Sequence, residues 1–158
     1  PPPPPPPPPP PFSRRSRHTR YSPWSRGLGD VYKRQGLRKS LNLGHTLGHA
    51  LESATGYTRF VHGEAVAWGL EAAAILGRRH GLLSSAGERR LCDASRNLGP
   101  RPAIADLDAE TVCSYIAADK KRDAEGVAWV LPTDNGVVLD QRVETAEAIE
   151  VLRELQRG

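Results

Sequence analysis

LNLGHTLGHALESA, residues 41–54, sets the architecture of this chain. Its apolar residues recur at intervals of three or four, which is the period of one buried face of an α-helix, at Leu43, Leu47, Ala50, Leu51 and Ala54. Gly56 follows as a helix terminator. We therefore predict an amphipathic helix over 41–54.

The sequence after this stretch predicts four further helices. Residues 63–80 are apolar on nearly all sides, which is typical of a helix buried within a core. Ser85 and Glu88 form a capping box that starts a third helix. Asp108 and Thr145 are the expected N-caps of the fourth and fifth helices.

One β-hairpin is indicated near the C-terminus. The apolar runs Val127–Leu131 and Val137–Leu139 are joined through Asn135-Gly136, a pair typical of tight hairpin turns. Pro132 cannot donate to a strand ladder, so it restricts the pair to a sheet edge. The predicted fold class is mainly α, a helical domain of about five helices with one small β-hairpin, preceded by a disordered, proline-rich leader.

Residues 1–35 differ from the rest of the chain in composition and charge. They open with eleven prolines, which favour a polyproline II rod, and carry seven Lys/Arg against one acid, net +6. Residues 36–158 carry 15 Lys/Arg against 17 acids, net −2, so the basic charge does not mark the folded part as a nucleic-acid binder. We expect the leader, 1–35, to be a disordered tail or non-native sequence, and the domain to span 36–158. The functional alternatives for the leader are an SH3-type ligand and a basic arm for nucleic acid.

The composition excludes several classes of protein. Cys92 and Cys113 stand far apart and outside any CxxC motif, which excludes a disulfide framework and a thiolate metal site. The longest apolar stretch, Ala65–Gly77, contains Glu71 and is shorter than the roughly 20 residues that cross a bilayer. The chain does not open with a secretory signal. We expect a soluble, cytoplasmic protein with no membrane and no nucleic-acid partner.

Three histidines lie within 18 positions of one another. His45 and His49 stand four apart and project from one face of the first predicted helix. His62 lies where the second predicted helix begins, and an antiparallel helical hairpin could return its ring towards the first helix, although the long loop does not require this. The pattern suits a divalent metal site, although two histidines four apart are more often surface or packing residues than ligands. Glu52, two turns after His45, is expected to lie too far away to share its ion, and Glu64 to be a first-turn acid favoured by the helix dipole.

The residues around these histidines offer anion contacts and close packing. Arg38, one turn before Asn42, supplies a guanidinium fork suited to carboxylate or phosphate. Gly44 and Gly48 destabilise a helix unless a ligand or another backbone approaches closely, and packing against the second predicted helix is the alternative explanation. The pair Lys120-Lys121 is either solvated charge or a phosphate contact.

Three segments of the sequence resemble the 3-dehydroquinate synthase family. They are GLRKSLNLGHTLGHALE at 36–52, Gly56-Tyr57, and VHGEAVA at 61–67. The run DKK at 119–121, followed by Gly126 and an apolar strand, is similar to a later segment of that family. The resemblance extends from Gly36 to about Val151 and corresponds to the C-terminal helical domain of such an enzyme.

The resemblance implies an activity and a set of site residues. Family members are lyases of the shikimate pathway that convert 3-deoxy-D-arabino-heptulosonate 7-phosphate, a phosphorylated sugar acid, to 3-dehydroquinate, using NAD and a divalent metal, zinc or cobalt. By the same resemblance His45 and His62 are metal ligands, and His49 is a substrate contact and proton relay. The remaining implied substrate contacts are Arg38, Asn42 and Lys121 or Lys120.

Other parts of the family's site come from its N-terminal domain, namely a glutamate metal ligand and nearly all of the NAD site. Gly27-Leu-Gly29-Asp30 is not a GxGxxG motif, and residues 1–35 do not resemble that domain. We therefore expect this chain by itself to bind zinc weakly, to bind NAD undetectably and not to turn over substrate. A homodimer is expected for a full-length member. A sibling sugar-phosphate cyclase and an interaction module that presents the polyproline tail remain the alternatives.

Overall fold

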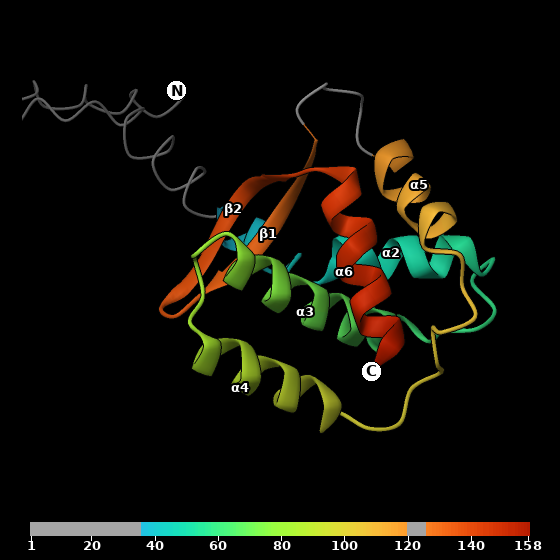
Figure 1. Cartoon of the computed structure of the whole chain (residues 1–158), viewed down its shortest axis with the longest axis horizontal. Helices are drawn as coiled ribbons and strands as arrows, with labels where there is room; N and C mark the ends of the chain where they lie inside the picture. Colours follow the sequence, from blue (N-terminus) through green and yellow to red (C-terminus); the bar gives the residue numbers. More distant parts are fainter. Residues whose placement is uncertain (1–35, 120–125) are drawn as a thin grey trace, which may run out of the picture.

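The computed structural model describes residues 36–119 and 126–158 (Figure 1). This part consists of a short helical segment at 36–40, α2 (His45–Ala54), α3 (His62–Arg79), α4 (Ser85–Arg96), α5 (Ala109–Asp119), β1 (Val127–Thr133), β2 (Gly136–Val143) and α6 (Thr145–Arg157). The predicted mainly α fold with one β-hairpin is confirmed. The leader, 1–35, lies outside the described residues.

Helix α3 is the centre of the fold. It contacts α2, α4, α6 and β1, and Figure 1 shows it in the middle of the molecule, with α4 on one side and α6 crossing it on another. Ten of its residues are buried, as its nearly continuous apolar sequence predicts. The described helices include none with the length and apolar character needed to cross a membrane. The largest fully buried side chains include Leu47, Leu51, Leu76, Leu131 and Leu152, so the core lies where α2, α3, β1 and α6 meet.

The β-hairpin is longer than predicted. β1 and β2 pair antiparallel, with Val127 opposite Val143 and Thr133 opposite Gly136. The hairpin is a two-stranded sheet, so both of its strands are edges. This explains how Pro132 is accommodated within β1, as the sequence predicts.

Helix α2 begins at His45, four residues later than predicted. Gly44 precedes it in a left-handed conformation, with φ of 79°, which ends the turn over 41–44 and starts the helix. A Cβ added to Gly44 would lie 2.9 Å from the carbonyl oxygen of Val66, and one added to Gly48 would lie 3.2 Å from the Val66 Cα. Both glycines therefore allow α2 to pack closely against α3, as the packing alternative proposed.

The helix caps agree with the sequence only in part. Asp108 caps α5, because its carboxylate accepts a hydrogen bond from a first-turn backbone N–H at 2.8 Å. The cap of α4 is Ser84, whose hydroxyl accepts from a first-turn N–H at 3.0 Å, so the predicted cap at Ser85 is one residue late. Thr145 is likewise the first residue of α6 rather than its cap, which is Glu144.

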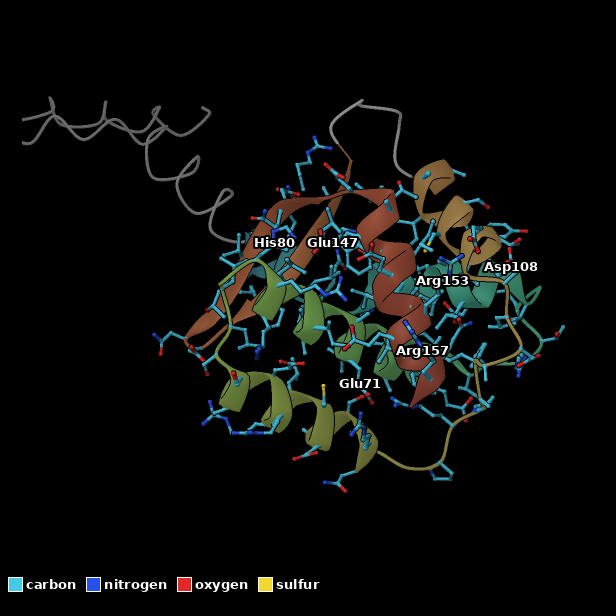
Figure 2. All side chains as sticks on the ribbon, viewed as in Figure 1. Glu71, His80, Asp108, Glu147, Arg153 and Arg157 are labelled. Carbon is cyan, nitrogen blue, oxygen red and sulfur yellow. The ribbon has the colours of Figure 1, made fainter. Side chains whose placement is uncertain are left out.

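A buried carboxylate joins α3 to α4 and to the loop that follows α4. Glu71 is 1% exposed and accepts hydrogen bonds from Arg96, at 3.1 Å, and from Arg101. Figure 2 labels Glu71 between α3 and α4. The Arg101 guanidinium lies 3.7 Å from the centre of the Trp68 ring, whose Nε1–H donates to the carbonyl of Pro102 at 3.0 Å. Two cations thus compensate one buried charge, and the loop is held against α3.

Candidate metal and substrate site

The rings of His45, His49 and His62 converge where α2 and α3 meet. Their centroids are separated by 5.5 Å for His45 and His49, 5.1 Å for His45 and His62, and 5.7 Å for His49 and His62. His45 and His49 lie one turn apart on α2, and His62 is the first residue of α3. The return of His62 towards the first helix, which a helical hairpin would produce, is confirmed.

The loop between α2 and α3 is held by an ion pair. Both terminal nitrogens of Arg59 donate to the Asp106 carboxylate at 2.7 Å, and one also donates to the carbonyl of Ala103. The hydrogen bond from Arg59 holds the pKa of Asp106 below its ordinary value. Next to Arg59, Phe60 is buried. This loop places His62 at the start of α3, where the Val61 backbone N–H donates to Glu64 at 2.9 Å, as expected of a first-turn acid.

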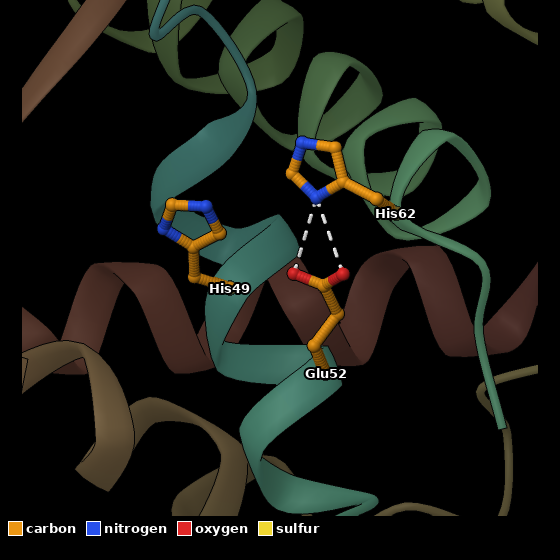
Figure 3. Close-up of side chains that lie close together, drawn as sticks. All are labelled: His49, Glu52 and His62. Carbon is orange, nitrogen blue, oxygen red and sulfur yellow. Dashed lines mark hydrogen bonds and ion pairs between the residues drawn. The ribbon is translucent and has the colours of Figure 1, made fainter. Parts of the chain in front are cut away.

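The ring of His62 is bound by the carboxylate of Glu52. Its Nδ1 lies 3.1 Å from Oε1 and 3.3 Å from Oε2 of Glu52 (Figure 3). Glu52 lies on α2 and is 7% exposed, whereas the His62 side chain is 53% exposed. The expectation that Glu52 lies too far from His45 to share its ion stays a prediction, but the carboxylate makes a contact that spacing along one helix did not predict. Glu52 joins the cluster through His62, on the neighbouring helix.

The ring of His45 is held by a backbone carbonyl. Its Nδ1 lies 3.2 Å from the carbonyl oxygen of Leu43. A carbonyl oxygen only accepts hydrogen bonds, so in the neutral ring Nδ1 carries the proton and Nε2 has a free lone pair. In His62 the Glu52 carboxylate has the same effect. Both histidines therefore have an unprotonated Nε2, whose lone pair can bind a metal.

His49 differs from the other two histidines. Its side chain is exposed, and within the described part of the chain its ring forms no hydrogen bond. It stands one turn after His45 on the same face of α2 and stacks at 29° to the ring of His62. Its two nitrogens are thus open to a molecule bound at the cluster.

A cavity of about 840 Å³ surrounds the cluster. Helix α2 and its flanks form one wall, the start of α3 another, and the last turns of α5 a third. The lining residues are Asn42, His45, Thr46, His49, Ala50, Glu52, Ser53, Tyr57, His62, Tyr115, Ile116 and Ala118. The cavity is therefore lined by three imidazole rings and two tyrosine side chains, among others, which suits a small polar ligand.

The predicted substrate contacts have different outcomes. Asn42 lines the cavity. Arg38 is exposed in the helical segment at 36–40 and is not among the residues that line it. Lys120 and Lys121 lie outside the described residues, so their roles stay predictions.

A tyrosine and a serine on the cavity wall were not among the residues predicted from the sequence. Tyr57 has φ of 57°, an uncommon conformation for a residue with a side chain, and its hydroxyl lies 3.0 Å from Oγ of Ser53. Ser53 stands one turn after His49, so the helical period could have revealed it. The position of Tyr57 depends on the turn after α2 and had no such signal.

The residues present fit a divalent metal. Imidazole nitrogens suit zinc and cobalt, and His49, Glu52 and His62 each offer one ligand atom within 4.8 Å of the others. Both carboxylate oxygens of Glu52, however, already lie at Nδ1 of His62. His45 and His62 are the two histidines of the cluster whose Nε2 atoms are kept free, because their Nδ1 atoms are hydrogen-bonded to a carbonyl and to a carboxylate oxygen. Two imidazoles supply part of a zinc coordination shell and leave positions open.

Comparison with known proteins identifies the family. A family model described as 3-dehydroquinate synthase C-terminal matches residues 29–122, which is more than half of the chain and includes α2 to α5. The chain belongs to the 3-dehydroquinate synthase family. The resemblance carried by the GHTLGH and HGEAVA strings is thereby confirmed, and both strings contribute to the histidine cluster.

Curated dehydroquinate synthases match most of the chain. The 3-dehydroquinate synthase of Solibacter usitatus (strain Ellin6076) is 39% identical over 118 residues, which are 74% of this chain and 33% of that protein. That of a Nitratiruptor species is 39% identical over 127 residues, 77% of this chain and 35% of that protein. The chain spans about a third of the length of the curated relatives that it matches.

Solved structures of a related cyclase share the fold. A 2-deoxy-scyllo-inosose synthase complexed with carbaglucose-6-phosphate, NAD+ and Co2+ is 26% identical and superposes with a TM-score of 0.55, covering 72% of this chain and 34% of that one. A second structure of 2-deoxy-scyllo-inosose synthase, 24% identical with a TM-score of 0.53, shows the fold alone. This chain thus shares its helical architecture with a cyclase crystallised with carbaglucose-6-phosphate, NAD+ and Co2+.

Proposed function

We propose that this chain is the metal- and substrate-binding part of a 3-dehydroquinate synthase. The reaction is the NAD-dependent, phosphate-eliminating cyclisation of 3-deoxy-D-arabino-heptulosonate 7-phosphate to 3-dehydroquinate. The observation that carries the proposal is the convergence of His45, His49 and His62 in one polar cavity of a dehydroquinate synthase family member. Because the chain spans about a third of its relatives, the whole reaction is assigned to an enzyme of their full length.

His45 and His62 would hold the metal, zinc or cobalt. Their ring centroids lie 5.1 Å apart, and each ring has its Nδ1 at an acceptor. A divalent cation bound there supplies Lewis-acid polarisation of a substrate oxygen. Support for such a cation in the family comes from the cyclase structure complexed with Co2+.

His49 would contact the substrate and accept or donate its proton. Its ring is exposed in the cavity and lies within 5.7 Å of both other rings, centre to centre. An imidazole nitrogen can take a proton from a substrate and return it, which suits this role. Asn42, at the same wall, would hydrogen-bond a substrate hydroxyl through its amide.

Cationic side chains would hold the phosphate and carboxylate of the substrate. We assign this role to Arg38 and to Lys121 or Lys120, whose charged donors suit these anions. NAD is assigned to the family's N-terminal domain and provides the hydride chemistry. The native assembly is proposed to be a homodimer.

A sibling sugar-phosphate cyclase is the second candidate. It is favoured by the likeness to 2-deoxy-scyllo-inosose synthase, a related cyclase complexed with a carbocyclic sugar phosphate. The two candidates share the metal and cavity residues and differ in the sugar they accept.

Metal and ligand binding test the proposal. Titration of Co²⁺ into the chain, followed by visible absorption, should give a band that His45→Ala and His62→Ala each remove. His80→Ala is the matched control, because His80 also belongs to a carboxylate–histidine pair but lies at the other end of α3. Retention of the band in the His45→Ala, His62→Ala double variant would contradict the metal assignment.

Calorimetry on the zinc-loaded chain separates the two cyclases. Binding of 3-deoxy-D-arabino-heptulosonate 7-phosphate should be stronger than that of carbaglucose-6-phosphate. The reverse order would contradict dehydroquinate synthase and favour the sibling cyclase.

A further inference from the structure

We infer that Glu52 is a positioning residue that sets the tautomer and orientation of His62, and that it is not itself a metal ligand. This inference rests on the proposed metal role of His62. It begins with burial, because Glu52 is 7% exposed on a helix whose other buried residues are apolar or glycine. A carboxylate removed from water requires a compensating partner.

The partner of Glu52 is one ring nitrogen. Both carboxylate oxygens lie at Nδ1 of His62, at 3.1 and 3.3 Å, and no other side chain in the described residues hydrogen-bonds to them. An ionised carboxylate only accepts hydrogen bonds. In the neutral imidazole, Nδ1 of His62 must therefore carry the proton, which leaves the lone pair on Nε2.

The geometry separates this role from direct ligation. Nδ1 and Nε2 lie on different sides of the imidazole ring, and Figure 3 shows the Glu52 carboxylate facing the Nδ1 side while the second nitrogen points away from it. A cation on Nε2 is therefore beyond the reach of a carboxylate held at Nδ1. In the compact group of His49, Glu52 and His62, His62 is therefore the metal ligand and Glu52 is the residue that orients it, so the three are not all ligands.

His45 has the same arrangement with a different acceptor. The carbonyl of Leu43, in the turn before α2, lies 3.2 Å from its Nδ1. Two rings whose centroids are 5.1 Å apart thus have their Nδ1 atoms occupied and their Nε2 atoms free. Such outer hydrogen bonds orient metal-binding histidines, and their loss typically lowers metal affinity by about 10–100-fold.

The first test measures the tautomer in the metal-free chain. Two-bond ¹⁵N–¹H spectra distinguish protonated from bare ring nitrogens, and we expect the Nδ1–H tautomer for His62, lost in Glu52→Ala. An Nε2–H tautomer for His62 in the unaltered chain would overturn the inference. This readout needs no metal and no variant, so it stands even where Glu52→Ala fails to fold.

The second test measures metal affinity with a matched control. Glu52→Gln should weaken Co²⁺ binding by about 10–100-fold while the shape of the visible spectrum is kept, because the ligands are unchanged. Glu147→Gln removes the carboxylate from His80, where Nε2 and Oε2 lie 3.1 Å apart (Figure 2), and should leave Co²⁺ binding unaltered.

Two results would contradict the role of Glu52 in that experiment. A changed Co²⁺ spectrum in Glu52→Gln would identify Glu52 as a ligand, and equal weakening by Glu147→Gln would show a general effect on stability. Failure of the unaltered chain to bind Co²⁺ would instead contradict the proposed function. In that case the His62 tautomer still decides whether Glu52 orients the ring.

Discussion

Gly69 of α3 lies directly against the peptide carbonyl of Gly44, the residue that precedes α2. A Cβ added to Gly69 would overlap the Gly44 carbonyl group, so no larger residue fits here without movement of a helix. This contact lies two turns along α3 from His62 and one residue before His45. The distance between the two proposed metal ligands therefore depends on the absence of a side chain at Gly69.

Replacing this glycine should disturb both stability and metal binding. Gly69→Ala inserts a methyl group against rigid backbone, and such overpacking lowers stability by about 1–3 kcal/mol. Urea unfolding should show the loss, and Co²⁺ titration should show weaker binding because α2 moves away from α3. The control is Gly63→Ala on the same helix, where an added Cβ meets nothing within 4 Å. Equal effects of the two variants would contradict the packing argument.

The two arginines that bind Glu71 should contribute differently to stability, because one is largely buried and the other is exposed. Arg101 is 10% exposed and Arg96 59% exposed, although both donate to the same carboxylate. Arg101→Ala should lower the free energy of unfolding by about 3–5 kcal/mol, because it leaves a buried charge without its buried partner. Arg96→Ala should have the effect of about 0–1 kcal/mol that is typical of exposed pairs. Urea denaturation measures both, and a larger effect for Arg96→Ala would contradict this account.

The cap of α5 should depend on pH. The side-chain and backbone hydrogen bonds from Thr111 lower the pKa of Asp108 below its ordinary value of 3.8. A lowered pKa means that the carboxylate stabilises the fold fully above that ordinary value and loses its effect as the pH falls through the lowered one. Thr111→Val should raise the pKa of Asp108 towards its ordinary value, as followed by carboxyl NMR titration. An unchanged titration midpoint would show that the hydroxyl has no such effect.

The two cysteines should be unreactive in the folded chain. Burial raises the pKa of both the Cys92 and the Cys113 thiols to about 11, with the negative charge of Glu71 adding to the effect at Cys92. At about pH 8 few thiolates form, and thiolate is the reactive species. Mass spectrometry should detect slow alkylation by iodoacetamide in buffer and fast alkylation in urea. Fast alkylation of either cysteine in the folded chain would contradict this prediction.

NAD should not bind to the described residues alone. Dinucleotide sites use parallel strands joined by a helix, with a glycine-rich turn at the helix start. Within the described part of the chain the strands form an antiparallel hairpin. Fluorescence titration with NADH should show no saturable binding, and a phosphate-release assay with NAD, zinc and the heptulosonate phosphate should show no turnover. Turnover by this chain alone would overturn the proposed division of the site.

The apolar periodicity of the sequence predicts the helices, but it does not predict the residues at which they begin and end. The apolar period predicts α2, and the long apolar run predicts the burial of α3. The start of α2 was predicted four residues early, because the sequence does not reveal that Gly44 adopts a positive φ and ends the preceding turn. Ser84 was missed as a cap because Ser85 matches the same pattern one residue later.

The spacing in the sequence alone places His45 and His49 on one face, because residues four apart on a helix are neighbours whatever surrounds them. The sequence strings at 36–52 and 61–67 also indicate the family without any coordinates. Only the packing of α2 on α3 decides that Glu52 meets His62, ten residues away on another helix. That contact depends on how closely two helices approach and on the loop pinned by Arg59 and Asp106, and neither is a function of spacing along one helix.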